Sequence, residues 1–155
     1  MKFSTREDVG VPIEAAFDML CDFEGFERSA MRRGAEVQRL DELRQPGPGM
    51  AWAAVFELRG KRRELELEIV TFDRPNEIVL ETTSPGLIGE VRFELIALSR
   101  NRTRLQVSIE VKPLNLSARL MVQSMKLAKA RLDRKFRDKV AEYAKGMEDR
   151  YAART

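Results

Sequence analysis

The chain has 155 residues, of which 43% are hydrophobic and 34% are charged, and its formal net charge is +3. This length and balance fit one globular domain with a core of its own, and they argue against disorder. The lack of histidine and the presence of a single cysteine exclude histidine-dependent hydrolases, histidine zinc sites, internal disulfides and multi-cysteine metal sites.

Targeting and cofactor motifs are also missing from the sequence. No glycine pattern of a P-loop or a dinucleotide-binding fold occurs, and no apolar run approaches the roughly 18 residues that a membrane span requires. The N-terminal residues are charged and lack the apolar segment of a signal peptide. We therefore expect a single domain over residues 1–155, located in the cytoplasm, with no metal and no cofactor.

The N-terminal segment combines a strand pattern with helix patterns. Residues 2–9 alternate between apolar and polar side chains, which predicts a strand with one exposed face. Apolar residues at helical spacing predict a short amphipathic helix over residues 13–20, and Pro12 suits its beginning. Asp22 is placed to cap a second short helix, which runs from Phe23 to about residue 33.

The middle of the chain predicts an antiparallel sheet. A strand is expected over residues 35–43, and the prolines and glycines of residues 45–49 predict a loop. Apolar and polar side chains then alternate repeatedly, and short turns separate the alternating runs. Consecutive strands joined in this way form an antiparallel sheet with one wet face and one dry face. The further expected strands cover residues 50–58, 64–69, 78–83, 90–95 and 104–111.

Residues 117–151 are expected to form one long helix, about 50 Å from end to end. Its apolar residues follow each other at spacings of three and four, which makes one continuous stripe. A helix with so long a stripe needs an apolar partner, and the dry face of the sheet supplies it. The stripe consists of Met121, Met125, Ala128, Leu132, Phe136, Val140, Tyr143 and Met147.

Three local sequences are informative beyond their periodicity: VGVPIEAAF at residues 9–17, DFEGF at 22–26 and PGMAW at 48–52. Together with the order of elements across nearly the whole chain, they resemble the START-like (SRPBCC) superfamily, in its polyketide cyclase/dehydrase-like or coenzyme Q-binding-protein-like branch. The resemblance implies an α+β helix-grip fold. In it, a curved antiparallel sheet of about six to seven strands wraps around the long C-terminal helix, and two short helices follow the first strand.

The resemblance also implies a cavity between the sheet and the C-terminal helix, which usually takes an apolar small molecule or a lipid. Each of the inward side chains that would line it is more often an ordinary core residue than a ligand contact, because apolar residues lie mostly inside. Few charges fall on the inward face, so the expected ligand is apolar. The candidate ligand-binding residues are Phe23, Phe26, Trp52, Phe56, Leu67, Ile69, Phe93, Met121, Met125, Leu132 and Phe136.

Few residues are candidates for catalysis. Cys21 has no base beside it in the sequence, so we expect a small core residue rather than a nucleophile. Glu81 lies in a strand that is apolar or neutral on both sides; facing inward it would be a general acid or base, but a solvated glutamate is the commoner state. Tyr143 and Arg39 are the other polar side chains to consider. No catalytic residue is assigned, because the histidine and the arranged polar set of catalytic relatives have no counterpart here.

Residues 119–139 contain eight basic and two acidic side chains. Most of them are expected to form a solvated helix face, with a weak contact to an anionic membrane surface as an alternative. Nucleic acid is disfavoured as a partner, because the net charge is small and no exposed aromatic side chains lie among the basic ones.

Three functions are compatible with the sequence. The leading hypothesis is that the chain binds a hydrophobic small molecule or a lipid in its cavity. An alternative is a polyketide cyclase- or dehydratase-like enzyme that uses a carboxylate or a tyrosine as acid or base. The third is a non-enzymatic interaction or regulatory module, which would expose a large apolar patch on the two short helices. The sequence makes no prediction of oligomeric state.

Overall fold

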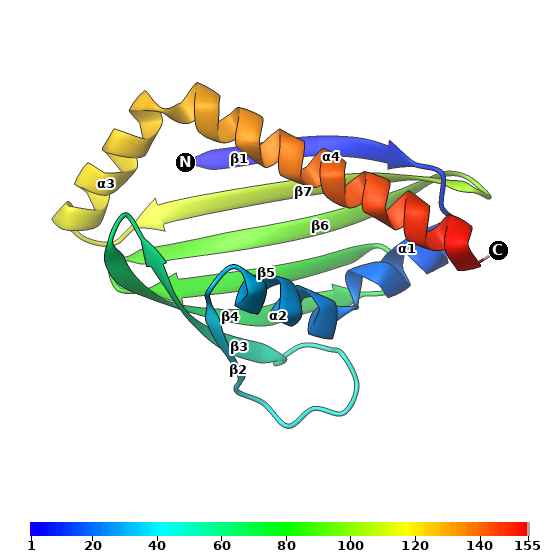
Figure 1. Cartoon of the computed structure of the whole chain (residues 1–155), viewed down its shortest axis with the longest axis horizontal. Helices are drawn as coiled ribbons and strands as arrows, with labels where there is room; N and C mark the ends of the chain where they lie inside the picture. Colours follow the sequence, from blue (N-terminus) through cyan, green and yellow to red (C-terminus); the bar gives the residue numbers. More distant parts are fainter. Residues whose placement is uncertain (155) are drawn as a thin grey trace.

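The computed structural model describes residues 1–154. Its seven strands form one antiparallel sheet in the order β1-β7-β6-β5-β4-β3-β2 (Figure 1). The elements in chain order are β1 (Lys2–Val9), α1 (Ile13–Leu20), α2 (Phe23–Arg32), β2 (Glu36–Arg39), β3 (Ala51–Leu58), β4 (Lys61–Asp73), β5 (Glu77–Ser84), β6 (Leu87–Ser99), β7 (Arg102–Pro113), α3 (Leu116–Leu127) and α4 (Lys129–Arg154). The expected α+β helix-grip architecture is confirmed.

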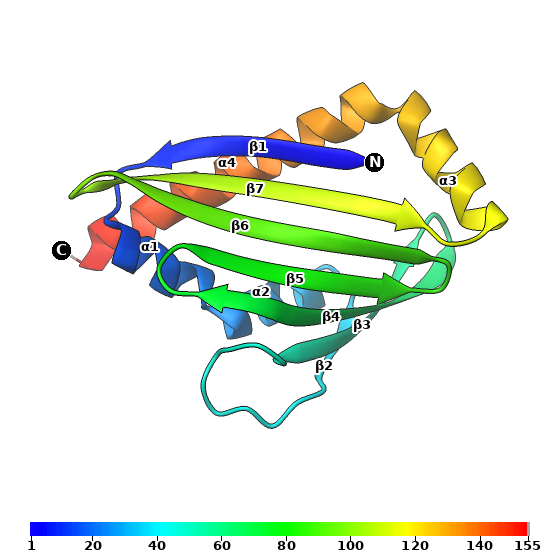
Figure 2. The same cartoon turned by 180° about the vertical axis from the view of Figure 1, so that it is seen from behind.

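The sheet is a meander whose first strand returns to pair with its last. β3 to β7 each pair with their neighbours in the sequence, and β1 pairs with β7 along its whole length. The back of the sheet is free of helices, while all four helices lie over its concave side (Figures 1 and 2). The apolar side chains of the strands therefore face the helices, as their alternation predicts.

The strand expected over residues 35–43 is shorter in the structure, where β2 ends at Arg39. Just after it, the carboxylate of Asp41 accepts hydrogen bonds from the backbone N–H of Leu43 and of Ala51, at 2.9 and 2.8 Å. These bonds occupy donors that a longer strand pair would use, so the chain leaves the sheet here and enters the loop.

The single helix expected over residues 117–151 is two helices in the structure. Ala128 separates them with backbone angles of φ −105° and ψ 17°, and the ribbon turns sharply at this point (Figure 1). No proline or glycine lies between residues 116 and 145, so the break has a tertiary cause. α3 packs near the end of β7 whereas α4 packs along β1, and one straight helix cannot follow both. No helix within residues 1–154 has the length and apolar character to cross a bilayer.

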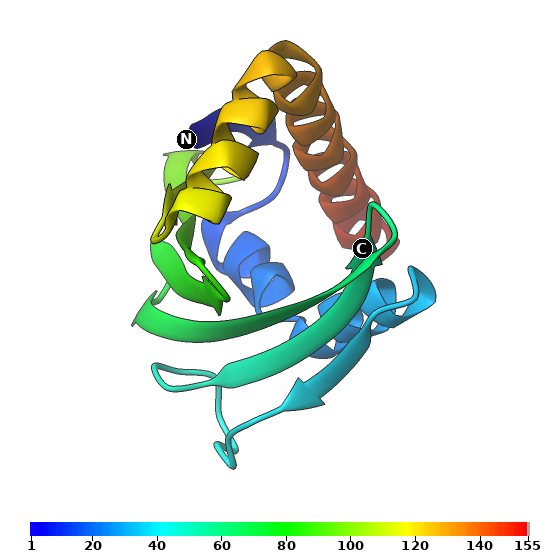
Figure 3. The same cartoon turned by 90° about the vertical axis from the view of Figure 1, so that its left-hand side faces the viewer.

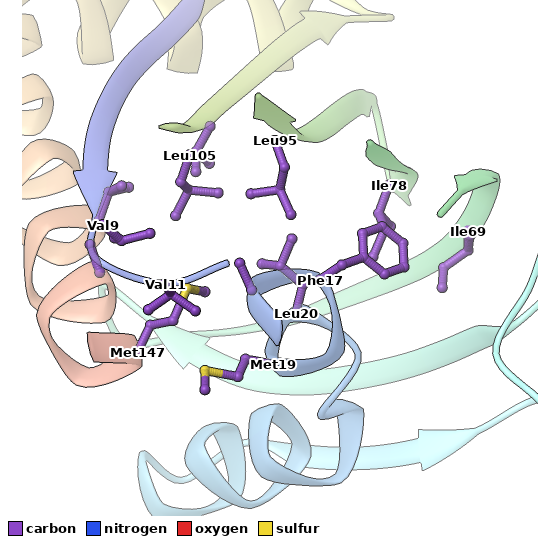
Figure 4. Close-up of a cluster of buried hydrophobic side chains, with 14 of the residues drawn as sticks. Val9, Val11, Phe17, Met19, Leu20, Ile69, Ile78, Leu95, Leu105 and Met147 are labelled. Atoms are coloured by element: carbon purple, nitrogen blue, oxygen red, sulfur yellow. The ribbon is translucent and has the colours of Figure 1, made fainter. Parts of the chain in front are cut away.

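The core forms where α1 and the end of α4 meet the sheet. Figure 4 shows Phe17 and Leu20 of α1 lying close to Leu95 and Ile78 of the strands. Met147 of α4 closes this cluster and is fully buried. Burying such side chains contributes about 1.5–3 kcal/mol each, which makes α1 the best anchored of the covering helices.

One polar side chain lies fully inside this core. The hydroxyl of Thr103 on β7 donates a hydrogen bond of 2.7 Å to the carbonyl oxygen of Val11, in the segment that links β1 to α1. A buried hydroxyl needs such a partner, because an unsatisfied polar group loses its hydration without compensation. Thr103 thus fixes where α1 starts relative to the sheet.

We predict that Thr103→Val lowers the free energy of unfolding by about 1–3 kcal/mol, because the carbonyl of Val11 loses its buried donor. Urea denaturation followed by circular dichroism measures the change. Thr5→Val is the matched control, since Thr5 is half-buried on β1 and the same change there removes no buried hydrogen bond. Equal effects of the two substitutions would contradict the role of the Thr103 bond.

Candidate functional site

A cavity of about 250 Å³ lies between α2 and the concave face of the sheet. Residues of α1, of α2 and of the five strands β2 to β6 form its walls. Its lining residues are Leu20, Phe23, Phe26, Glu27, Ala30, Val37, Trp52, Ala54, Leu67, Ile78, Leu80, Val91 and Phe93.

The positions of the strand residues in this wall follow from the register in which neighbouring strands pair. Trp52 lies opposite Leu67, Ile78 lies opposite Phe93, and Leu80 lies opposite Val91. Side chains at paired positions point to the same face of a sheet, so each pair places two apolar groups side by side on the concave face. The strand residues that line the cavity are therefore all apolar.

The space itself arises where small side chains stand among large ones. Ala54 follows Trp52 on the same face of β3, and Ala30 faces the cavity from α2. An alanine at either position leaves unfilled volume that a leucine or phenylalanine would occupy. Elsewhere on this face, large residues pack against each other and fill the core. Beside Ala54 and Ala30, the large residues surround an unfilled space.

Aromatic rings form the end of the cavity under α2. The rings of Phe23 and Trp52 lie 5.4 Å apart between centroids, and those of Phe26 and Tyr143 lie 5.7 Å apart. Trp52 is buried, but Phe26 remains 41% exposed, so Phe26 lies at the rim. α2 itself has no fully buried residue, which makes it the least firmly packed part of the wall.

Glu27 is the one ionisable side chain, within residues 1–154, that lines the cavity. The other polar candidates lie elsewhere. Glu81 is exposed on the outer face of the sheet, opposite Glu68 and Glu90 on the neighbouring strands. Tyr143 is half-buried on α4 with its hydroxyl 3.5 Å from the carbonyl oxygen of Met19, and burial raises the pKa of this phenol to about 12.

Arg39 has a structural partner rather than a free guanidinium. It forms an ion pair with Asp41 at 2.6 Å, and its guanidinium carbon lies 5.6 Å from the centre of the Trp52 ring. The hydrogen bond that Arg39 donates is the main reason why the pKa of Asp41 lies well below its usual range. The hydrogen bond from the backbone N–H of Ala51 is the second reason. This cluster fixes the edge of the sheet beside Trp52, and neither of its charged side chains lines the cavity.

The candidate ligand-binding residues divide into two groups. Phe23, Phe26, Trp52, Leu67 and Phe93 line the cavity. Ile69 is fully buried in the core, and Phe136 packs on Phe3 with ring centroids 6.0 Å apart. The remaining ones are half-buried outside the cavity wall; they are Phe56, Met121, Met125 and Leu132.

The cavity lies under α2 rather than under the C-terminal helix, where the sequence placed it. The reason is that α4 packs along β1, at one edge of the sheet, and leaves the opposite half to α2. Alternation could have identified Ala54, Leu80 and Val91 as further lining residues, since each shares a face with a large apolar neighbour. Glu27 and Ala30 carried no such signal, because the rotation of α2 about its axis depends on tertiary packing.

Solved structures establish the fold. A START superfamily protein from Mycobacterium smegmatis is similar over 99% of both chains, with 20% sequence identity and a TM-score of 0.62. The Zhui aromatase/cyclase of a Streptomyces species matches 75% of this chain and 70% of its own, with 17% identity and a TM-score of 0.57. An Hsp90 activator from Plasmodium falciparum matches 76% of this chain and 78% of its own, with 20% identity and a TM-score of 0.52.

These similarities confirm a START-like, helix-grip fold for this chain. No protein-family model and no curated protein matches the sequence. Identities of 20% or less carry the fold but not the chemistry, so function has to be argued from the site.

The thiol of Cys21 allows a direct test of the α1–α2 junction. Burial raises its pKa to about 11, and nearby Arg74 only partly offsets this. Because the thiolate is the reactive form, we predict that iodoacetamide alkylates Cys21 in the folded protein roughly a hundredfold more slowly near pH 8 than in urea. The folded-state rate should keep rising with pH through pH 10 (about one decade per unit), which mass spectrometry can follow. A plateau below pH 9 would show that the thiol is not buried.

Proposed function

We propose that this chain binds a hydrophobic small molecule or a lipid in the cavity between α2 and the sheet. The observation that carries the proposal is the cavity wall, which is apolar apart from Glu27. An apolar hollow favours an apolar occupant, because the occupant leaves water without losing hydrogen bonds. One structural neighbour is an aromatase/cyclase, which is compatible with a ligand of this kind.

The volume limits the size of the ligand. A cavity of about 250 Å³ exceeds the roughly 150 Å³ that holds benzene, and it approaches the lower limit of about 300 Å³ for common ligand sites. A fused two-ring molecule or a short branched chain fits this range. A longer lipid requires α2 to move outward, which its lack of fully buried residues permits.

We predict that Ala54→Phe weakens binding of a two-ring probe such as 2-naphthol at least tenfold, because the larger side chain fills the cavity. Isothermal titration calorimetry measures the affinity. Ala53→Phe is the matched control: Ala53 is the preceding residue of β3, its side chain points to the opposite face, and it pairs with Gln38 and Glu66. The control is expected to bind like the original chain.

A complementary experiment needs no chosen probe. Native mass spectrometry of the protein from its own host, followed by solvent extraction, would detect a co-purified ligand as a discrete mass above 17.8 kDa. If extraction yields nothing, and if Ala54→Phe binds 2-naphthol as tightly as Ala53→Phe, the cavity is not a binding site.

Glu27 supports one second candidate, a cyclase- or dehydratase-like enzyme. A carboxylate at the wall of an apolar cavity can transfer a proton to or from a bound ligand. Glu27→Gln separates the two functions. Loss of turnover with retained ligand affinity would support catalysis, whereas an unchanged ligand recovered from both proteins would support binding alone.

We also propose a weak contact with an anionic membrane surface, which would give an apolar ligand its source. The basic residues of the C-terminal helices support it, since residues 119–139 carry eight basic and two acidic side chains.

A further inference from the structure

The most exposed large hydrophobic side chains of the chain gather around α3. Leu116, Leu120 and Leu127 are 71%, 59% and 92% exposed, and Leu114 just before the helix is 61% exposed. Within residues 1–154, no other large hydrophobic side chain exceeds 53%. The interaction hypothesis placed an apolar patch on the short helices, and α2 does expose Phe26 and Met31, but less fully.

The three leucines of α3 form a stripe, which we call the leucine stripe. Spacings of four and seven residues put Leu116, Leu120 and Leu127 on one face of the helix. The helix packs on the body with its other face, where Ala118 and Val122 are buried. α3 is therefore apolar on two sides, and only one of them has a partner within the described chain.

Basic side chains flank the leucine stripe. Arg119 and Lys126 are exposed and lie seven residues apart, so they follow one edge of the stripe. Residues 111–132 contain five basic side chains and no acidic one. The whole chain has a net charge of only +3, so positive charge is concentrated in this segment.

A second element repeats this combination at the same end of the molecule. The hairpin between β3 and β4 exposes Leu58 and continues as Arg59-Gly60-Lys61-Arg62, all of which are exposed. Its turn lies at the end where α3 lies in Figure 1, and Figure 3 looks at that end with both elements in front. Glu57 and Glu64 flank the hairpin, and Arg62 pairs weakly with Glu64 at 3.7 Å, so the hairpin remains net positive.

We propose that this end of the molecule docks on an anionic lipid bilayer, with the leucine stripe in the headgroup region and Arg119, Lys126 and the hairpin cations on lipid phosphates. An amphipathic helix with leucines on one face and basic side chains at the edge of that face is an arrangement that binds such an interface. This inference rests on the membrane contact proposed above. It names α3 and the hairpin, rather than the outer face of α4, as the surface that makes the contact.

The observations favour a bilayer over a nucleic acid or a protein groove. Residues 111–132 contain no aromatic side chain that could stack on bases, and exposed leucines contribute nothing to phosphate binding. A groove in a protein would cover one helix, whereas the leucines and cations here are distributed over α3 and a separate hairpin. A lipid bilayer is a broad surface with anionic headgroups outside and apolar acyl chains below them. It can therefore contact the leucines and the cations of both elements at once.

Vesicle co-sedimentation tests the proposal with ligand-free protein. The original chain is expected to bind phosphatidylcholine vesicles that contain about 30 mol% phosphatidylglycerol, and to bind less in about 0.5 M salt or without the anionic lipid. Replacing the stripe together (Leu116→Ser, Leu120→Ser, Leu127→Ser) should lower the partition coefficient at least tenfold. Arg119→Gln with Lys126→Gln should lower it roughly tenfold.

Matched controls change the same chemistry elsewhere. Ile96→Ser with Leu98→Ser removes exposed apolar side chains from the far end of β6, and Lys139→Gln with Lys145→Gln removes two cations from α4. Both should leave vesicle binding unchanged. The proposal is overturned if the original chain stays in the supernatant, or if the controls weaken binding as much as the α3 variants do. In the second case a membrane contact survives but not this surface.

Tryptophan fluorescence tests the same surface without removing the leucine stripe. This measurement remains informative if the triple serine variant misfolds. Leu127→Trp keeps an apolar side chain at an exposed site, and the emission that it adds to that of Trp52 should shift to shorter wavelength when anionic vesicles are added. Leu98→Trp should show no shift. Absence of a shift at residue 127 would contradict insertion, whatever the other variants do. Binding of 2-naphthol should be the same in all these variants, so a failure of docking is distinguishable from a failure of the cavity proposal.

Discussion

The concave face of the sheet is largely apolar, and the helices of the chain cover it incompletely. α1 and the C-terminal half of α4 cover the side near β1, β7 and β6 with fully buried side chains such as Phe17 and Met147. The side near β3 and β4 receives only α2, which buries no residue completely. The cavity is the result of this imbalance, since a face that is apolar but incompletely covered retains space beside its smallest side chains.

Ligand binding and local stability are therefore linked in this fold. The segment that closes the cavity is the one with the fewest buried contacts, and local opening draws on such segments first. The capping bond from the backbone of Gly25 to Asp22 and the contact of Phe26 with Tyr143 hold α2 at its start and its middle. A ligand that fills the space under Trp52 and Ala54 would add the packing that α2 now lacks.

The sequence predicted the strands well because alternation is a local property. Leu65, Leu67 and Ile69 face inward wherever this strand lies in the sheet, so their faces could be assigned before the fold was known. The break at Ala128 and the course of α4 along β1 are properties of the assembled molecule, with no proline or glycine to indicate them. The cavity was expected under the wrong helix for the same reason. The exposed leucines of α3 lie outside the predicted stripe, because this helix has two apolar faces and the stripe follows only one of them.

Both edges of the sheet are protected. β2 is an edge strand of four residues, and the loop anchored at Asp41 follows it directly. β1 is the other edge, and α4 packs along it. Long uncovered edge strands offer unpaired N–H and C=O groups to other chains and so promote edge-to-edge aggregation. In a chain that exposes leucines at one end, edge strands that are short or packed against a helix limit strand-mediated self-association.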